Sequence, residues 1–509
     1  MSGPGDETPA PGPEDGSSAG DGARHGLEEL IAERRAKAER LRAADPEAFP
    51  YTFPSAEPIA TVLDAYQHLA VGEETDDVHR VAGRIAARRG AGKAAFLDLV
   101  DRTGKIQLHA RVDVLGETAF ERLTSLDLGD LLGVDGSVLR SRHGELSLRV
   151  ERFELLSKAL RPPPDKHHGL SDVETRYRHR ELDLIANEES RRVFMQRAAI
   201  VSAVRRYLDG EGFVEVETPI LQSLYGGALA RPFTTHHNAL DRDLYLRIAT
   251  ELYLKRLIVG GLERVYELGK DFRNEGISPK HNPEFTMVEW YEAYADYEAE
   301  ATRTEQIVAA AAEAAGYDGP LDFGGSRWER IGFVEAIQAA TGIDVMEHPD
   351  PDQLRAAIAA KGLDMNTAEQ TWPQLADDLL SKYVEPSLQR PTFVLDYPVA
   401  LSPLAREHRT KPGLVERWEA FAGGMEIANA FSELIDPDEQ RERFAAQHRL
   451  GAAGDEESHP YDETFVQALE QGMPPTGGVG LGIDRLVMLL TGRETIREVV
   501  LFPAMRDQG

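Results

Sequence analysis

Three consecutive prolines, Pro162 to Pro164, divide this chain into two parts. Each proline fixes its own φ and removes a backbone donor, so the run Arg161-Pro-Pro-Pro-Asp165 cannot continue a helix or a sheet and is expected to form a stiff linker. A length of 509 residues agrees with this division, because single hydrophobic cores rarely grow beyond about 250 to 300 residues. The segments before and after the prolines are therefore expected to form separate domains.

Short runs of alternating apolar and polar residues recur before the linker. They occupy residues 79–89, 94–101, 105–112, 131–141 and 145–156, and turns such as Arg102-Thr103-Gly104 separate them. Five strands at this spacing predict a small β-barrel over residues 77–160, and the oligonucleotide-binding (OB) fold is one such barrel. Upstream, residues 1–26 carry almost no large apolar side chains and are expected to be a disordered tail, followed by an N-terminal helical extension over residues 27–76.

The segment after the prolines mixes helices with strands. Helical patterns cover residues 191–209, 251–259 and 297–315, and the strand-like runs between them are not regular βαβ units. This mixture predicts an α+β domain over residues 191–509, with a mixed, mostly antiparallel sheet and flanking helices. A helical insertion is expected at about 300–390, and residues 161–190 are assigned to the linker.

Composition excludes several classes of function. The chain has no cysteine, which rules out disulfides, thiolate zinc sites and cysteine nucleophiles. It has no H-E-x-x-H zinc motif and no G-x-x-x-x-G-K-[ST] phosphate loop. No apolar run approaches the roughly twenty residues that a membrane span needs, and the N-terminal segment lacks the apolar centre of a signal peptide, so we expect a cytoplasmic protein that does not engage a membrane.

The charge distribution gives two opposite signals about nucleic acid. A formal net charge of −30 argues against a polyanionic partner. Residues 80–111, within the predicted barrel, nevertheless carry eight Arg and Lys residues against two Asp. Because each charge acts over only about 10 Å in salt, such a local cluster can bind phosphates. Phe96 and Gln107 are candidates to stack on a base and to hydrogen-bond it, although Phe96 could equally belong to the barrel core and the cations to a solvated face.

Residues 264–297 read as a strand, a polar loop and a second strand. In the second strand, alternation places Phe285, Met287, Glu289 and Tyr291 on one face. An unpaired Glu is costly in a core, so this face suits a ligand that has a flat ring and a cationic group. Arg273, with His281 across the loop, offers a donor set for phosphate. The alternative is a surface hairpin held by salt bridges.

A dense group of acidic residues occupies residues 418–436. It includes Glu419, Glu426 and Glu433, with Asn429 and several apolar residues between them. The carboxylates are either solvated on one face or gathered around a cation. Asn429 and Glu433 share strand parity, whereas Glu426 does not. If all four meet one ligand, the strand must contain a bulge or a turn.

Alternate glycines mark the last of these segments. Gly478, Gly480 and Gly482 fall on one face of a strand that leads into an apolar helix near Arg485. Glycines at this spacing clear one face of side chains, so a ligand can lie flat against the backbone. The pattern is not G-x-G-x-x-G, and it lacks the βαβ context of a dinucleotide site.

Together these segments resemble the three signature motifs of class II aminoacyl-tRNA synthetases. The residues that carry the resemblance are GFVEVETP at 212–219, FRNE at 272–275 with its loop and second strand, and GLGIDR at 480–485. A barrel ahead of the catalytic domain is similar to the lysyl, aspartyl and asparaginyl subgroup. Within that subgroup GGALARPF at 226–233, ELYLKRL at 251–257 and NAFSEL at 429–434 resemble the bacterial lysyl enzymes.

The resemblance implies a role for each candidate residue. Arg273 and Arg485 would be the catalytic arginines that hold the α- and γ-phosphates of ATP. ATP would be bound by Arg273, Glu275, His281, Phe285, Glu419 and Arg485. Mg²⁺ would be bound by Glu419 and Glu426. Lysine would be bound by Gly227, Glu251, Glu289, Tyr291, Asn429 and Glu433. The anticodon of tRNA(Lys) would be read by Arg88, Phe96 and Gln107.

The resemblance also implies a reaction and an assembly. The enzyme would be a lysine–tRNA ligase that activates L-lysine with ATP and transfers it to the 3′ end of tRNA(Lys), and it would be a homodimer with Pro219 at the interface. Two departures from the family are Thr250, where Pro is usual, and Ala400, where many bacterial relatives have Glu. Two alternatives remain: a paralogue that delivers lysine to a protein or lipid, and a catalytically silent tRNA-binding protein.

Overall fold

The computed structural model separates into two units at the end of the proline-rich segment. It describes residues 18–45, 48–90, 92–164, 170, 172–228, 230–324, 327–368, 370–452 and 460–506. The units are Met1–Gly169 and Leu170–Gly509. Among the described helices, none is both long enough and apolar enough to traverse a lipid bilayer.

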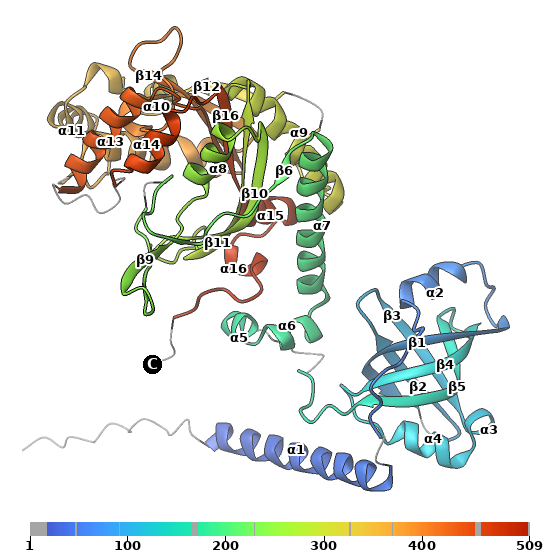
Figure 1. The fold of residues 1–509 in the computed structure, drawn as a ribbon. Coiled ribbons are helices and arrows are strands. Elements are labelled where there is room, and N and C mark those ends of the chain that lie inside the picture. The colour runs from blue at the N-terminus through green and yellow to red at the C-terminus, as the bar shows by residue number, and fades with distance from the viewer. Residues whose placement is uncertain are drawn as a thin grey trace, which may run out of the picture. The chain divides into compact units, whose positions relative to one another are not determined.

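The first unit contains a closed five-stranded barrel, which confirms the predicted fold (Figure 1). The strand order around the barrel is β1 (Glu74–Arg89), β2 (Ala94–Val100), β3 (Lys105–Arg111), β5 (Leu146–Ser157) and β4 (Leu131–Arg140). Only β3 and β5 pair in parallel, and the other neighbours are antiparallel. Alternate side chains point inward and form one apolar core, which includes Val81, Ile85, Leu97, Leu108 and Leu148.

Helices flank the barrel in sequence. The first, α1 (Ser18–Ala44), begins before residue 27, within the segment that was expected to be a disordered tail. Extending a nucleated helix is far easier than starting one, and the helix therefore continues into a polar stretch. Residues 1–17 of the expected tail lie outside the described residues. Further on, α2 (Ile59–Ala65), α3 (Val112–Leu115) and α4 (Glu117–Thr124) contribute apolar side chains to the barrel core.

Part of the predicted linker is helical. It contains α5 (Val173–Arg178) and α6 (Arg180–Ala186), which are joined by the buried carboxylate of Asp183. This carboxylate accepts hydrogen bonds from Arg176 at 2.8 Å and from Arg180 at 2.7 Å. The long helix α7 (Glu188–Gly210) follows. Ordered structure of the second unit therefore begins well before residue 191.

An eight-stranded sheet forms the centre of the second unit, as Figure 1 shows. Its order is β12 (Glu329–Gly332), β13 (Thr392–Pro398), β14 (Leu414–Ala422), β15 (Met425–Ser432), β16 (Thr476–Gly482), β11 (Glu284–Ala293), β10 (Arg264–Phe272) and β6 (Val214–Glu215). The two outer pairs, β12 with β13 and β6 with β10, are parallel, and the inner pairs are antiparallel. The prediction of a mixed, mostly antiparallel sheet is confirmed.

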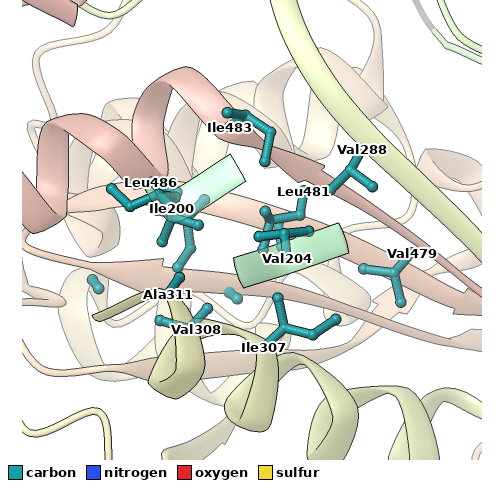
Figure 2. Packing of buried hydrophobic residues seen from close by; sticks show 14 of the residues in the cluster. Ile200, Val204, Val288, Ile307, Val308, Ala311, Val479, Leu481, Ile483 and Leu486 are labelled. Atoms are coloured by element: carbon teal, nitrogen blue, oxygen red, sulfur yellow. The ribbon is translucent and has the colours of Figure 1, made fainter. Parts of the chain in front are cut away.

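Helices cover one face of this sheet. Figure 2 shows Ile200 and Val204 of α7 packed with Leu481 of β16 and with Ile307 of α9 (Tyr297–Ala315). The helix α15 (Ile483–Thr491), which follows β16 directly, adds Leu486 to the same core. On β11, Val288 and Trp290 point into this core. Glu289, which lies between these two residues, therefore points to the opposite face of the sheet.

The predicted insertion at about 300–390 is only partly separate. The helix α9 belongs to the main core, and β12 joins the central sheet. The remaining helices form a smaller core of their own against β13 and β14. They are α10 (Phe333–Thr341), α11 (Pro351–Ala360) and α12 (Trp372–Leu379), followed by the short turns η2 (Leu380–Val384) and η3 (Glu385–Ser387).

Other short elements lie around the sheet. A three-stranded sheet has the order β7 (Leu221–Gln222), β9 (Arg242–Leu246) and β8 (Thr234–His237). The helices α8 (Glu251–Val259), α13 (Pro437–Ala452) and α14 (Glu463–Leu469) contribute to a further apolar cluster that includes Tyr291 of β11. This cluster closes one end of the exposed sheet face.

Candidate active site

A cavity of about 500 Å³ lies on the face of the sheet that α7 and α9 leave uncovered. Residues of β11, β14, β15 and β16 form its floor, and the loop after β10 and the insertion contribute its walls. The cavity brings together most of the predicted site residues. These are Gly227, Glu251, Arg273, Glu275, His281, Phe285, Glu289, Tyr291, Glu419, Glu426, Asn429 and Arg485.

Strand register explains why these residues meet. Glu289 pairs with Gly480, Gly480 pairs with Asn429, and Asn429 pairs with Glu419 across four neighbouring strands. Directly opposed residues in antiparallel strands point to the same face of a sheet. A single row across the sheet therefore carries three predicted ligand-binding side chains, with a glycine in the middle.

The glycines keep the floor of the cavity open. A Cβ added to Gly478 would collide with the carboxylate of Glu433 and with the ring of Tyr291. Glycine is therefore required at position 478 by close packing, whereas a Cβ on Gly480 would come no nearer than 3.3 Å, to the side chain of Met287. Gly478 thus makes room for two side chains of the protein, and the clearing of this face for a ligand stays a prediction.

Three carboxylates gather at one end of the site. Glu251 opens α8, Glu289 lies on β11 and Glu433 follows β15, and each is at most 5 % exposed. Glu289 accepts hydrogen bonds from the Thr250 backbone N–H at 3.1 Å and from the Tyr291 hydroxyl at 3.2 Å. Glu433 lies over Gly478, next to Tyr291, but does not line the cavity itself. This end of the site therefore carries three carboxylates, two of which line the cavity.

Burial and mutual repulsion shift the acidities of these groups. Burial, with added repulsion from Asp271 and Glu251, raises the pKa of Glu289 to about 8. Burial also raises the pKa of Glu433 to about 8, against the opposing effect of Lys255. The pKa of Glu251 is raised for the same primary reason. Such a site favours a ligand that brings positive charge.

The opposite end of the cavity carries arginines and an aromatic ring. The guanidinium of Arg273 lies 5.1 Å from the centre of the Phe285 ring. Arg485 donates to Glu426 Oε2 at 2.7 Å, and its other terminal nitrogen lies 3.1 Å from Nε2 of His281. Burial, reinforced by Arg485, lowers the pKa of His281, so the imidazole is neutral and can accept this hydrogen bond. Glu275 lies in the loop that follows Arg273.

The predicted bulge in β15 is present. Ala420 pairs with Ala428, but the next residue of β14, Phe421, pairs with Glu426, so Ile427 is the extra residue. The bulge changes the strand parity and allows both Glu426 and Asn429 to line the cavity. Glu426 and Asn429 are three residues apart, so a regular strand would place them on opposite faces, and the bulge brings both to one face.

Glu419 and Glu426 form an acidic pair beside the arginine end. Burial raises the pKa of Glu419 to about 7, with Glu426 and Asp377 adding to the increase against the effect of Arg417. In the described part of the chain, no three His, Asp or Glu side chains gather closely enough to hold a metal by themselves. Two repelling carboxylates that share a cavity fit a cation whose other ligands come from a bound phosphate or water.

Two charged residues in or next to the cavity, Lys255 and Arg417, were not predicted. Lys255 is fully buried and forms ion pairs with Glu251 and Glu433. Arg417 lies across the sheet from Phe431, donates to Asn429 at 3.0 Å and to Glu419 at 2.5 Å, and lies 4.4 Å from the centre of the Tyr397 ring. Arg417 could have been found from the sequence, because it lies two residues before Glu419 and therefore on the same face of the strand.

The two departures noted in the sequence differ in their surroundings. Thr250 donates its backbone N–H to Glu289, a hydrogen bond that proline at this position could not make. Ala400 lies in the short turn Val399–Leu401 and is exposed. Only Thr250 therefore contacts a predicted site residue directly.

The barrel presents a second candidate surface. Phe96 is only partly buried, so it is not a core residue, and its ring stacks on His109 with centres 4.7 Å apart. Gln107 lies on the same face, is 4 % exposed, and donates to Glu145 at 2.7 Å. Arg89 is directly opposite Phe96. These residues combine a stacking plate, an amide and a cation on one face.

Arg88 is exposed but has different partners from Phe96 and Gln107, and its predicted role in reading the anticodon stays a prediction. It pairs with the core residue Leu97, and its guanidinium donates to the backbone carbonyls of Thr124 and Leu126 at the end of α4. A shift of register between Ile85 and Ala87 sets the parity of the residues that follow. The sequence alone did not reveal this irregularity.

Several cations of the barrel have acidic partners. Arg80 pairs with Asp135 at 2.7 Å, and Arg89 lies 3.4 Å from Glu145. These carboxylates come from β4 and from the residue before β5, outside the basic segment of the sequence. The surface is therefore less strongly basic than a count over residues 80–111 suggests.

Comparison with known proteins identifies the family of each domain. Residues 172–506 match the model of tRNA synthetases class II (D, K and N), and residues 79–156 match that of the OB-fold nucleic acid binding domain. A lysine–tRNA ligase from Synechococcus sp. (strain CC9311) is 51% identical over 490 residues, covering 95% of this chain and 100% of the relative. The lysine–tRNA ligase from Moorella thermoacetica is 49% identical over 486 residues, covering 94% and 98%. The chain therefore belongs to the class II tRNA synthetases of the D, K and N type, among which its curated relatives are lysine–tRNA ligases.

Proposed function

We propose that this protein activates L-lysine with ATP and joins it to the 3′ end of tRNA(Lys). The acidic end of the cavity carries the proposal. Glu251 and Glu289 line this end, and Glu433 is buried next to it, so the end suits the ammonium groups of an amino acid. A pocket for aspartate would need Arg or Lys at this end, and a neutral asparagine side chain gives no compensation for three buried carboxylates.

Each end of the substrate has complementary groups. Glu251 and the backbone around Gly227 bind the α-ammonium of lysine, and Asn429 binds its carboxylate. Glu289, Tyr291 and Glu433 surround the ε-ammonium. Gly227 has a φ of 90°, and a Cβ there would lie 3.0 Å from the side chain of Glu251, which supports a role for this glycine in a close approach to the ligand.

ATP occupies the arginine end of the cavity. Phe285 provides a flat surface for adenine, and Arg273 binds the α-phosphate. Glu275 and His281 contact the nucleotide, and Arg485 binds the γ-phosphate by exchanging its carboxylate partner Glu426 for phosphate. A guanidinium suits this exchange because it can form paired hydrogen bonds with either group.

Glu419 and Glu426 would hold Mg²⁺ together with oxygens of ATP. Their shared cavity and the raised pKa of Glu419 fit a cation, although Glu419 also pairs with Arg417 and Tyr397. When bound, the ion supplies positive charge that neutralises the phosphates and the pyrophosphate leaving group.

The reaction needs positioning and charge stabilisation more than proton transfer. The carboxylate of lysine attacks the α-phosphorus in line, and pyrophosphate leaves from the opposite side. Arg273 and Arg485 stabilise the charge that develops on the phosphate oxygens. The 3′-hydroxyl of tRNA then attacks the carbonyl of the lysyl-adenylate, which forms the ester and releases AMP.

The barrel binds the anticodon of the same tRNA in this proposal. Phe96 stacks on a base and Gln107 hydrogen-bonds one, while Arg89 contacts the backbone or a base edge. Arg88 is exposed and holds the end of α4 through the backbone carbonyls of Thr124 and Leu126. The enzyme would act as a homodimer in the cytoplasm, with Pro219 at the interface between subunits.

Charging of tRNA tests the complete function. The purified protein, ATP, Mg²⁺ and lysine are incubated with a tRNA(Lys) transcript that has a UUU anticodon, and lysyl-tRNA is measured. A transcript with the aspartate anticodon on the same body is the control. We expect efficient lysylation of the first only. Formation of lysyl-adenylate without any charged tRNA would contradict the proposal and favour delivery of lysine to another acceptor.

A further inference from the structure

One ammonium group next to the proposed amino-acid pocket belongs to the chain itself, on Lys255. Lys255 lies one turn along α8 from Glu251, and its side chain is fully buried. Its Nζ atom lies 2.5 Å from Oε1 of Glu251 and also forms an ion pair with Oε2 of Glu433. Lys255 therefore bridges two carboxylates that come from different elements.

The bridged carboxylates have different tasks in the proposed function. Glu251 binds the α-ammonium of the substrate and Glu433 binds its ε-ammonium, so their separation must match the length of a lysine side chain. Oε1 of Glu433 has no hydrogen-bond partner among the described residues. It lies over Gly478 and close to Tyr291, which lines the cavity. Glu433 thus has one oxygen held by Lys255 and one without a hydrogen-bond partner next to the pocket.

The charges of the pocket match those of lysine when Lys255 is included. Glu251, Glu289 and Glu433 can carry three negative charges, and Lys255 reduces this to two. The neighbouring carboxylates of Glu267 and Asp271 form ion pairs with Arg247, and Arg273 lies close to Asp271. The two negative and two positive charges of these four groups therefore cancel. A lysine substrate brings two ammonium groups. Without Lys255, one buried carboxylate would lack a partner, which is costly.

We propose that Lys255 is a positioning residue for amino-acid selection, which fixes the separation of Glu251 and Glu433 and leaves the pocket one negative charge for each ammonium group of lysine. This inference rests on the proposed function. It extends that function by assigning the selection of chain length to a residue that need not touch the substrate. Rejection of ornithine, which is one methylene shorter, should then depend on Lys255.

Substitution of Lys255 by Met removes the charge and keeps most of the volume. The measurement is amino-acid-dependent exchange of pyrophosphate into ATP, with lysine and ornithine as substrates. For Lys255→Met we expect the KM for lysine to rise about ten- to hundredfold, by analogy with other removals of one partner from a buried charge pair. We expect the preference for lysine over ornithine to fall, while the KM for ATP changes less than about twofold, since Lys255 lies at the far end of the cavity from the arginines.

A matched control keeps the helix and changes only packing. Leu254→Met alters a fully buried neighbour of Lys255 on α8 without changing charge, and we expect both the KM for lysine and the ornithine ratio to stay near wild type. If Leu254→Met reproduces the effects of Lys255→Met, the role of Lys255 is only structural and the proposal is wrong.

A double-mutant cycle separates charge matching from folding. Lys255→Met with Glu433→Gln removes both members of one ion pair, so it should fold even if Lys255→Met alone does not. We expect its thermal midpoint to lie above that of Lys255→Met, and its discrimination against ornithine to remain lost. Additive losses in stability, or retained rejection of ornithine, would overturn the proposal.

The wild-type enzyme distinguishes the two levels of inference. If wild type shows no lysine-dependent exchange, the proposed function fails. If wild type is active and Lys255→Met keeps both its KM for lysine and its rejection of ornithine, only the role of Lys255 fails.

Discussion

Glu289 is a carboxylic acid in a buried position, where an apolar side chain would be favoured by burial alone. Both its oxygens accept hydrogen bonds, one from the Thr250 N–H and one from the Tyr291 hydroxyl, yet burial still raises its pKa from 4.5 to about 8. In the folded protein it keeps a proton up to about pH 8, whereas an unfolded Glu loses it near 4.5. Between these two pH values the folded state therefore binds more protons than the unfolded state. The contribution of Glu289 to the free energy of unfolding falls as the pH rises through this range.

This acidity predicts a pH-dependent affinity for lysine. The ε-ammonium of lysine remains charged up to a pKa of about 10.4, so below pH 8 it must displace a proton from the pocket. The Kd for lysine should fall by up to about tenfold for each pH unit between about pH 6.5 and about pH 8. The charged and titratable groups that face Glu289 are Glu251, Lys255, Asp271, Tyr291 and Glu433.

Calorimetry in two buffers of different ionisation enthalpy measures both the affinity and the protons released. Glu289→Gln is the control, since its amide cannot titrate, and it should bind lysine weakly with a flatter pH dependence. A Kd that stays constant over this range, with no proton release in wild type, would show that the carboxylates are already ionised in the empty pocket.

At the scale of elements, alternation and glycine spacing allowed much of the site to be predicted. The face of β11 that carries Phe285, Met287, Glu289 and Tyr291 followed from its period of two, because one face of the strand packs on helices. The conflicting parity of Glu426 and Asn429 indicated a bulge or a turn if both met one ligand, and the strand has a bulge at Ile427. Both inferences needed only local sequence.

Other features depended on partners far along the chain. The partners of Arg88 depend on a shift of register in β1, which has no local signature in the sequence. Lys255 and Glu251 are four residues apart on a helix, a spacing typical of surface ion pairs. Lys255 links two carboxylates because Glu433, which follows β15, also lies close to it in the folded chain. Tertiary contacts of this kind cannot be read from periodicity.

Arg88 and Arg89 provide a matched pair for testing the barrel surface. We expect Arg89→Ala to raise the KM for tRNA(Lys) several-fold, because it removes a cation from the face of Phe96. Arg88→Ala should instead lower the thermal midpoint of the protein, since it removes hydrogen bonds to the end of α4. The measurements are aminoacylation kinetics with tRNA as the varied substrate and thermal unfolding. A reversed pattern would restore Arg88 as the residue that reads tRNA.

At the scale of the whole molecule, each unit has its own apolar core, so the division at the prolines reflects two independently stabilised domains. The second unit also exposes apolar side chains close together in sequence. Val214, Ile220 and Leu221 are 50%, 46% and 49% exposed, on either side of Pro219. Clustered exposed apolar residues are typical of interfaces between subunits.

We predict that this surface joins two copies of the chain. Wild type should sediment as a dimer at micromolar concentration, and Ile220→Asp should shift it toward monomer, because a charge would be buried without a partner. Met346→Glu is the control, since Met346 is similarly exposed at 39% but lies in the insertion. Analytical ultracentrifugation distinguishes these outcomes. A wild-type monomer, or an Ile220→Asp variant that remains a dimer, would contradict this interface.

Amino-acid-dependent exchange of pyrophosphate into ATP tests most directly whether the acidic pocket selects lysine. The assay needs only the protein, ATP, Mg²⁺ and one amino acid, so it is independent of tRNA and of the barrel. Exchange should be rapid with lysine and near background with aspartate and asparagine, because three buried carboxylates oppose an acidic side chain and give a neutral amide no compensating charge. Exchange with aspartate or asparagine and none with lysine would contradict the assignment of Glu251, Glu289 and Glu433 to a lysine pocket.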